Sequence, residues 1–168
     1  MKYQIIYDSK TGNTKKLAEH IYEYLKGNER EIKTVAEFDA TEEADVYFVG
    51  FYTNRNSCSL ETADVLEMLD GKKIALFGTC GMGNTQEYYE KIRKNIDVWM
   101  PEDYEDCGFF MCQGRMKDKI KERISIMSQK MTDDARCELW QMYDDGLTHP
   151  DEEDLVKLEI FVESAIKK

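Results

Sequence analysis

The stretch YQIIYDSKTGNT, residues 3–14, decides the fold of this chain. Its first half is apolar and aromatic, which is typical of a buried strand. Its second half, Ser9 to Thr14, is rich in hydroxyl groups and has Gly12 where the chain must bend. Apolar residues then recur at spacings of one, three and four from Leu17 to Leu25, which predicts a helix. A turn of this kind offers free N–H groups and a positive dipole end to a phosphate group. The same residues also serve as ordinary helix caps, and that alternative stays open.

Strands and helices alternate along the rest of the chain. We expect further strands at residues 31–38, 45–52, 74–78 and 108–113, with helices at 60–69 and 84–94 between them. Residues 116–143 predict helix in two pieces that break near Thr132, and a last helix follows Pro150. This alternation indicates an α/β fold with helices on both faces of a parallel sheet. Five strands in this pattern suit a doubly wound five-stranded sheet of order 2-1-3-4-5, with additional C-terminal helices.

Length and composition set the broad class of the protein. With 168 residues, of which 42% are hydrophobic and 34% charged, we expect a single domain over 1–168. Its core covers about residues 1–113, and helices over 114–168 are added to it. No apolar run approaches the roughly 20 residues that span a bilayer, and the N-terminus does not fit a signal peptide, so we expect a cytoplasmic protein.

Charge and cysteine content exclude several classes of function. The net charge of −11 argues against nucleic acid and anionic membranes as partners. It permits docking onto a basic protein, although solubility explains it equally well. The five cysteines form neither a disulfide framework nor a cluster with histidine, so we expect no metal site.

Three loops meet at one edge of the expected sheet. The loops after strands one, three and four are residues 9–14, 52–58 and 79–83. The carboxyl ends of parallel strands open onto the same edge, and ligands bind there where the strand order reverses. The sequence therefore predicts that these loops surround one site.

The order Ser9-x-Thr11-Gly12-Asn13-Thr14 after a first strand resembles the flavodoxin family, and the resemblance covers about residues 2–113. It implies an FMN cofactor whose phosphate lies in the first loop and whose ring lies between the other two. This sequence departs from the family pattern in the third loop, which has Met82 and Asn84 in place of an acidic residue and a stacking aromatic. The implied cofactor-binding residues are Ser9, Lys10, Thr11, Gly12, Asn13, Thr14, Tyr52, Thr53, Asn54, Thr79, Cys80, Gly81, Met82 and Gly83.

Details of these loops give further expectations. Tyr52 can stack on the ring or close the core as a strand-end residue. Arg55 can lie near the ring, where a cation raises the flavin potential, or can face solvent. Cys80 is interpreted as a small filler rather than a redox thiol. Gly114 to Met116 follow the last strand and can close the pocket from above.

The favoured function is FMN-binding electron transfer, in which low-potential electrons pass to a partner oxidoreductase. It needs no catalytic side chain, because the cofactor carries the redox chemistry. The low potential is expected from acidic surroundings, which disfavour a reduced anion. Two alternatives stay open: an FMN-dependent reductase of quinones or small molecules that uses NAD(P)H, and a flavin-free regulatory domain of the same fold.

Overall fold

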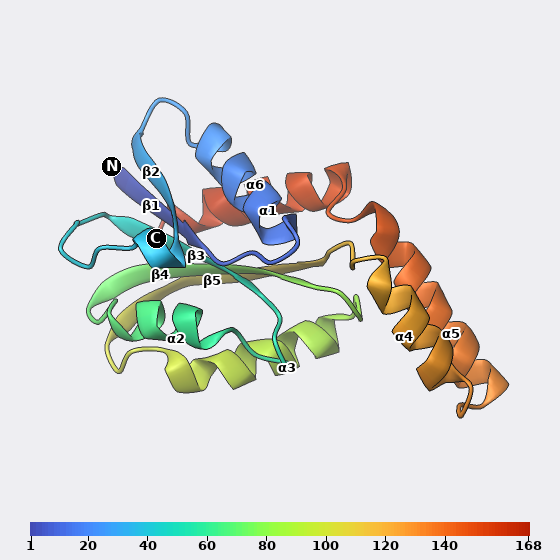
Figure 1. The fold of residues 1–168 in the computed structure, drawn as a ribbon. Coiled ribbons are helices and arrows are strands. Elements are labelled where there is room, and N and C mark those ends of the chain that lie inside the picture. The colour runs from blue at the N-terminus through green and yellow to red at the C-terminus, as the bar shows by residue number, and fades with distance from the viewer.

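Five parallel strands form the centre of the structure, a computed structural model that describes residues 1–168 (Figure 1). The order in the sheet is β2-β1-β3-β4-β5, and every neighbouring pair is parallel. The expected doubly wound order, 2-1-3-4-5, is confirmed. The strands are β1 (Lys2–Tyr7), β2 (Glu29–Thr34), β3 (Val46–Tyr52), β4 (Lys72–Cys80) and β5 (Tyr104–Gln113).

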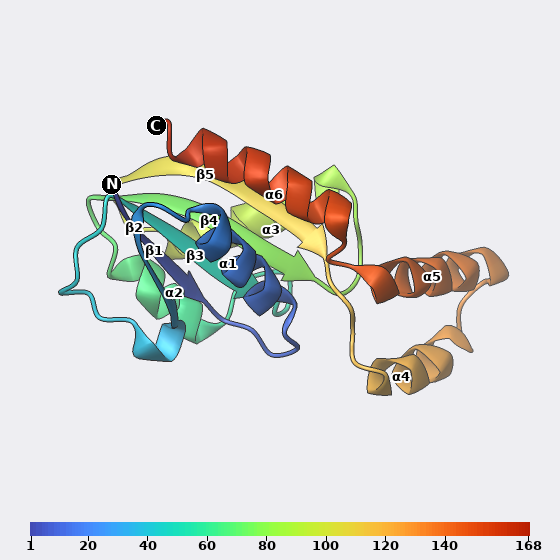
Figure 2. The ribbon, with the colours of Figure 1, turned by 90° about the horizontal axis from the view of Figure 1, so that it is seen from above.

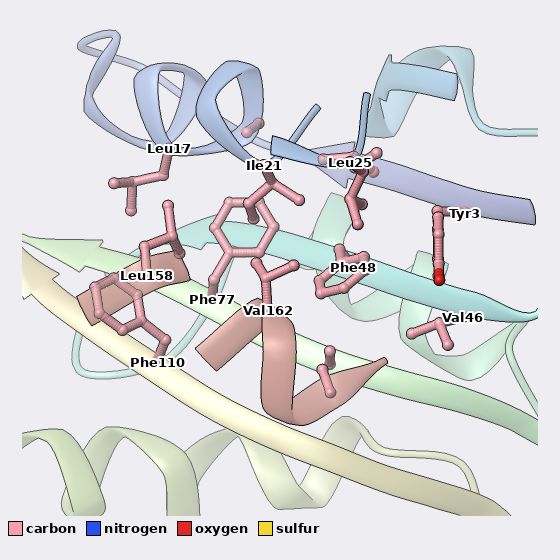
Figure 3. Close-up of a cluster of buried hydrophobic side chains, with 14 of the residues drawn as sticks. Tyr3, Leu17, Ile21, Leu25, Val46, Phe48, Phe77, Phe110, Leu158 and Val162 are labelled. Carbon is pink, nitrogen blue, oxygen red and sulfur yellow. The ribbon is translucent and has the colours of Figure 1, made fainter. Parts of the chain in front are cut away.

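Four helices cover the two faces of the sheet. The helices α1 (Asn13–Tyr24) and α6 (Glu152–Ala165) pack on one face, and α2 (Leu60–Glu67) and α3 (Gln86–Ile96) pack on the other (Figures 1 and 2). Figure 3 shows Ile21 of α1 and Val162 of α6 pointing toward Phe77 of the sheet. Both faces are therefore apolar, which explains the near-continuous apolar runs of β3 and β4.

The boundaries of β2, β4 and β5 differ most from the sequence-based expectation. β2 ends at Thr34, where a short 3-10 helix, Val35–Glu37, begins and Glu37 accepts a hydrogen bond from the Thr34 amide at 3.0 Å. β4 continues two residues beyond Gly78, because Thr79 and Cys80 pair with the end of β5. β5 begins at Tyr104, four residues early, and accommodates a register shift beside Ile74. The third loop therefore lies two residues later than expected, between Cys80 and Gln86, where α3 begins.

The helices α4 (Lys119–Ser128) and α5 (Asp133–Asp145) form a hairpin that extends away from the sheet (Figures 1 and 2). The predicted break near Thr132 is confirmed, since its hydroxyl caps α5 by accepting from the Ala135 amide at 3.4 Å. The hairpin has its own small core of Ile124, Leu139 and Tyr143. None of the helices combines the length and the apolar composition that a membrane crossing requires.

Candidate functional site

A cavity of about 460 Å³ lies at the carboxyl edge of the sheet. The loops after β1, β3 and β4 all contribute to its wall, as the sequence predicts. The segment after β5 and the start of α4 add Met116 and Ile120. The volume falls within the range of small-molecule and cofactor sites, and the position is the point where the strand order reverses.

The first loop presents unpaired backbone donors at the N-terminus of α1. Gly12 is the N-cap and has φ +92°, a conformation that glycine adopts without strain. Its amide donates to Ser9 Oγ at 3.1 Å, and the first helical bond runs from Lys16 N to the Gly12 carbonyl at 2.9 Å. The amides of Thr11, Asn13 and Thr14 have no acceptor within the chain. Such a group of free N–H donors at a helix start fits a phosphate group.

Two residues of this loop also brace it against the rest of the molecule. Thr14 is buried, and its hydroxyl lies 2.9 Å from the hydroxyl of Thr79 at the end of β4. The side-chain amide of Asn13 donates to Thr11 Oγ1 at 2.9 Å and to the Arg115 carbonyl at 2.8 Å. These bonds fix the loop relative to β4 and to the segment after β5.

The second loop is a tight reversal between Asn54 and Ser57. The Asn54 amide donates to the Ser57 carbonyl at 2.7 Å, and the Ser57 amide returns a bond of 3.0 Å. The two central residues, Arg55 and Asn56, have φ values of +51° and +62°. Positive φ at both central positions is typical of a type I′ turn, which usually takes Asn-Gly. Arg55 therefore adopts a strained conformation on the cavity wall.

Thr53 precedes this turn and offers a polar atom to the cavity. Its amide donates to the Thr79 carbonyl at 2.8 Å, which anchors the backbone. Its hydroxyl oxygen is buried and has no hydrogen-bond partner, although the residue lines the cavity. Buried polar atoms are normally paired, so a bound ligand with a polar edge fits this position.

Two tyrosines contribute rings to the cavity wall. Tyr52 lies at the end of β3, with the Lys10 ammonium 4.7 Å from its ring centroid. The neighbouring Tyr52 raises the pKa of Lys10. Tyr88 reaches the cavity from the first turn of α3, and its hydroxyl donates to Asn56 Oδ1 at 3.2 Å. The chain therefore supplies a second aromatic wall, although the third loop itself has no aromatic residue.

The third loop is held from the hairpin side. The side-chain amide of Gln113 donates to the Gly81 carbonyl at 3.1 Å and to the Met142 carbonyl at 2.7 Å. Met82 packs with the apolar core of the hairpin. Burial raises the pKa of Cys80 to about 12, and its thiol donates to the Gly83 carbonyl at 3.2 Å. A thiol with that pKa is not nucleophilic at neutral pH, which supports its interpretation as a filler.

The charge of the cavity wall is positive. Four basic residues line it, and no carboxylate does. The expectation of acidic surroundings is therefore wrong at the cavity itself, because the acidic residues of the chain lie elsewhere on its surface. The four basic residues are Lys10, Arg55, Arg115 and Lys117.

The structure separates the sequence-based site residues into two groups. Nine of the fourteen line the cavity: Lys10, Thr11, Asn13, Tyr52, Thr53, Thr79, Cys80, Gly81 and Met82. Five lie in the same loops without lining it: Ser9, Gly12, Thr14, Asn54 and Gly83. Further lining residues include Asn56, Tyr88, Lys117 and Ile120, which come from the turn, α3 and the hairpin. The helical period of α3 and α4 predicts their faces, but no local signal in the sequence brings those faces to this edge.

Together, the 2-1-3-4-5 sheet, the donor-rich loop after β1 and the aromatic-walled cavity define a doubly wound domain of the flavodoxin type. Comparison with known families agrees: the flavodoxin domain family matches residues 4–163, and the chain belongs to this family. Membership implies a flavin cofactor, usually FMN, and supports a general role in flavin-dependent electron transfer.

Two curated relatives have nearly the same length as this chain. Both are described as flavodoxin-like domain-containing protein BilS. The relative from Clostridioides difficile is 32% identical over 100% of this chain and 98% of its own length. The relative from Clostridium symbiosum is 33% identical over 99% of this chain and 96% of its own length.

Solved structures share the fold at lower identity. A flavodoxin from Streptococcus pneumoniae TIGR4 aligns with a TM-score of 0.63 and 20% identity over 99% of both chains. Oxidised flavodoxin 2 from Bacillus cereus aligns with a TM-score of 0.59 and 22% identity, again over 99% of both chains. At such identities the likeness concerns the fold alone.

Proposed function

We propose that this protein binds FMN in the cavity and passes electrons to a separate oxidoreductase. The observation that carries the proposal is the set of unpaired amides at Thr11, Asn13 and Thr14, next to a cavity of cofactor size. When bound, FMN supplies reversible transfer of one or two electrons, and the protein supplies binding and environment.

Each part of the cavity has a role in this proposal. The first loop holds the phosphate with backbone donors and the Thr11 hydroxyl. Tyr52 and Tyr88 provide rings for stacking, which adds about 0.5–1.5 kcal/mol beyond the burial of area. The Thr53 hydroxyl, which lacks a partner within the chain, pairs with a polar edge of the ring. Met116 and Ile120 cover the cavity from the hairpin side.

The cations on the wall affect the potential that we expect. Positive charge near a flavin favours its reduced, anionic form. The reduction potential of the flavin is therefore higher here than in a cavity lined by carboxylates. We still expect the electrons to leave for a partner protein, and a potentiometric titration of the FMN complex measures how low the potential is.

Flavin titration tests the proposal directly. We expect the purified protein to quench FMN fluorescence with saturation, and Thr11→Ala to weaken FMN binding about 10- to 100-fold, the effect of one lost hydrogen bond to a charged group. Riboflavin, which has no phosphate, should bind equally to both proteins. Thr11→Ser keeps the hydroxyl and is the matched control. Indifference to millimolar FMN would refute the proposal, and equal losses for both ligands would refute the phosphate role of the loop.

One observation favours a second candidate function. The segment after β5 extends the cavity wall beyond the three loops with Met116, Lys117 and Ile120, next to where a small substrate would contact a ring. An FMN-dependent reductase of quinones or other small molecules would use such a space. Steady-state oxidation of NADPH with a quinone by the FMN-loaded protein distinguishes it from a carrier, which shows no such turnover.

A further inference from the structure

The cations around the cavity are unusual in a chain with a net charge of −11. Lys10, Arg55 and Lys117 are exposed, and none of them forms a salt bridge. Lys33 and Lys72, in contrast, each contact a carboxylate elsewhere on the surface. The positive charge around the cavity is therefore largely unneutralised by salt bridges.

Few acidic groups lie near the rim, and some of them already contact other side chains of this protein. Arg115 pairs with Asp118 at 3.5 Å, and both side chains are exposed. Asp8 and Glu61 lie near Lys10, and the Asp8 carboxylate already accepts the Ser59 hydroxyl at 2.6 Å. Exposed pairs of this kind are weak and easily exchanged for a partner's groups.

The positive surface continues from the cavity along α4. Residues 115–130 contain six basic and two acidic residues, so this segment has a net charge opposite to that of the whole chain. Lys119 and Arg123 lie one helical turn apart on the same side of α4, are exposed and form no salt bridge. Lys121 is also exposed, but it lines a different hollow together with Asp118 and Glu122. Lys119 also lines a shallow hollow next to the first loop, which Lys117 and Arg115 share.

Apolar side chains follow the basic residues at the far end of α4. Ile126 is 68% exposed and Met127 is 61% exposed, in the part of the hairpin that extends away from the sheet (Figure 2). Exposed apolar groups rimmed by charge are typical of a protein interface. A surface that reaches from the cavity to the tip of the hairpin is larger than a small molecule can cover.

We propose that the electron-transfer partner presents an acidic protein surface to this basic rim (Lys10, Arg55, Arg115 and Lys117) and to the exposed side of α4. The inference rests on the proposed function, since it assigns the partner class of the same site. It reverses the polarity suggested by the net charge, which would favour a basic partner. Charge of this kind mainly speeds association and orients the encounter, so the redox centre of the partner arrives next to the flavin cavity.

Two haem proteins of opposite polarity test the proposal. Cytochrome b5 has an acidic haem edge, and cytochrome c has a basic one. We expect the ¹⁵N-labelled full chain, with or without FMN, to show chemical-shift changes at residues 115–128 and in the first loop when cytochrome b5 is added at low salt. Shifts that appear only with cytochrome c, or that map to α5 and α6, would overturn the proposal. Because the measurement does not require flavin, its outcome is independent of FMN binding.

Kinetics of the FMN-loaded protein give the second readout. After reduction with dithionite, the flavin transfers one electron to the ferric haem of cytochrome b5, which becomes ferrous. We expect the second-order rate constant to fall about tenfold as ionic strength rises from 10 to 300 mM, as for a steered encounter. The double variant Lys117→Gln/Lys119→Gln should lose most of this salt dependence. The control Lys26→Gln/Lys167→Gln removes the same charge at the opposite edge of the sheet and should keep it.

A small anionic acceptor is the competing explanation. Ferricyanide is a trivalent anion, so its reaction rate reports the electrostatic potential near the flavin without any contact to a partner protein. A salt-sensitive rate with ferricyanide but not with cytochrome b5 would overturn the protein partner and leave only a site for small anions. If both rates increased with added salt, the surface around the flavin would repel anions, and the assignment of a positive rim would be wrong.

Discussion

The side-chain amide of Asn13 donates to the main-chain carbonyl of Arg115 at 2.8 Å, across 102 residues of sequence. The bond joins the loop after β1 to the segment that leaves β5 toward the hairpin. A Cβ at Gly114 would come within 2.6 Å of Asn13 Nδ2, so the Asn13 side chain lies directly against the backbone of Gly114. The loop after β1 and the hairpin are therefore mechanically connected at the cavity.

Asn13→Ala should loosen this connection. The variant loses the bonds to Arg115 and to Thr11, each worth about 0.5–1.5 kcal/mol, so we expect FMN to bind several-fold more weakly. We also expect faster amide hydrogen exchange in residues 114–128 than in the wild type. Asn28→Ala, which removes only a local bond to the Leu25 carbonyl, is the control. Unchanged exchange in the hairpin would show that the bond does not hold it.

The middle of the sheet depends on two reciprocal pairs of glycine and phenylalanine. Gly50 of β3 lies opposite Phe77 of β4, and Phe51 lies opposite Gly78. A Cβ at Gly50 would overlap the Phe77 ring, and one at Gly78 would lie 2.5 Å from Phe51 Cζ. The two rings pack on opposite faces of the sheet, so each glycine makes room for a ring on its own face.

Gly78→Ala should therefore destabilise the protein by about 1–3 kcal/mol, the usual effect of overpacking a core. Denaturant unfolding measures the loss. The double variant Gly78→Ala/Phe51→Leu should be more stable than the sum of the two single effects predicts, because the smaller side chain relieves the overlap. Additive effects of the two substitutions would indicate that the Phe51 ring moves aside freely.

Much of this arrangement could be predicted from the sequence. The apolar runs of β1, β3 and β4 and the turn at residues 9–14 determine the strand order and the three convergent loops. The break near Thr132 is predicted because a threonine before two aspartates is a typical N-cap. Such features depend on residues close together in the sequence, which is where pattern reasoning is strongest.

The rest depends on contacts between distant segments. Tyr88 lies at the cavity wall next to the second loop, where its hydroxyl donates to Asn56 Oδ1 at 3.2 Å across 32 residues of sequence. Lys117 and Ile120 reach it because Gln113 and Asn13 hold the segment after β5. The extension of β4 to Cys80 follows from its pairing with β5. No local pattern encodes these contacts, so the sign of charge at the cavity could not be deduced from the net charge.

The start of α6 should show a defined dependence on pH. Asp151 accepts a hydrogen bond from the Asp154 amide at 3.1 Å, and this bond holds the pKa of Asp151 below its usual value. A carboxyl whose pKa is lower in the folded state contributes stability above its unfolded pKa, near 4, and loses it as the pH falls through the folded value. We expect Asp151→Ala to lower the free energy of unfolding by about 1 kcal/mol at pH 7 and by much less near pH 2.

Urea unfolding at several pH values measures this difference. Asp151→Asn keeps the hydrogen-bond acceptor without the charge, so at pH 7 it should lose the charge-dependent part of the stability, and it should show no titration between pH 5 and pH 2 at this position. A loss for Asp151→Ala that is equally large at pH 7 and pH 2 would mean that the charge of the cap contributes nothing.

The turn at Arg55 and Asn56 combines strain with charge at the cavity. A non-glycine residue with φ of +51° is destabilised by about 1 kcal/mol relative to glycine, yet this position carries an arginine on the cavity wall. Strain of this kind often persists where a side chain has a function. We expect Arg55→Gly to raise the free energy of unfolding of the apo-protein by about 0.5–1 kcal/mol while it removes a cation from the flavin environment.

The same substitution should therefore change stability and redox potential in opposite senses. Loss of one charge near the ring changes the reduction free energy by about 1 kcal/mol, on the order of 40 mV for one electron, and shifts the potential of bound FMN downward. Arg55→Lys keeps the charge and the strain, so it should leave both quantities close to wild type, and Arg55→Gln should lower the potential without stabilising the fold. Potentiometric titration and denaturant unfolding separate the two effects. If Arg55→Gly and Arg55→Gln gave the wild-type potential, the arginine would not act on the flavin, and the strain at this turn would need another cause.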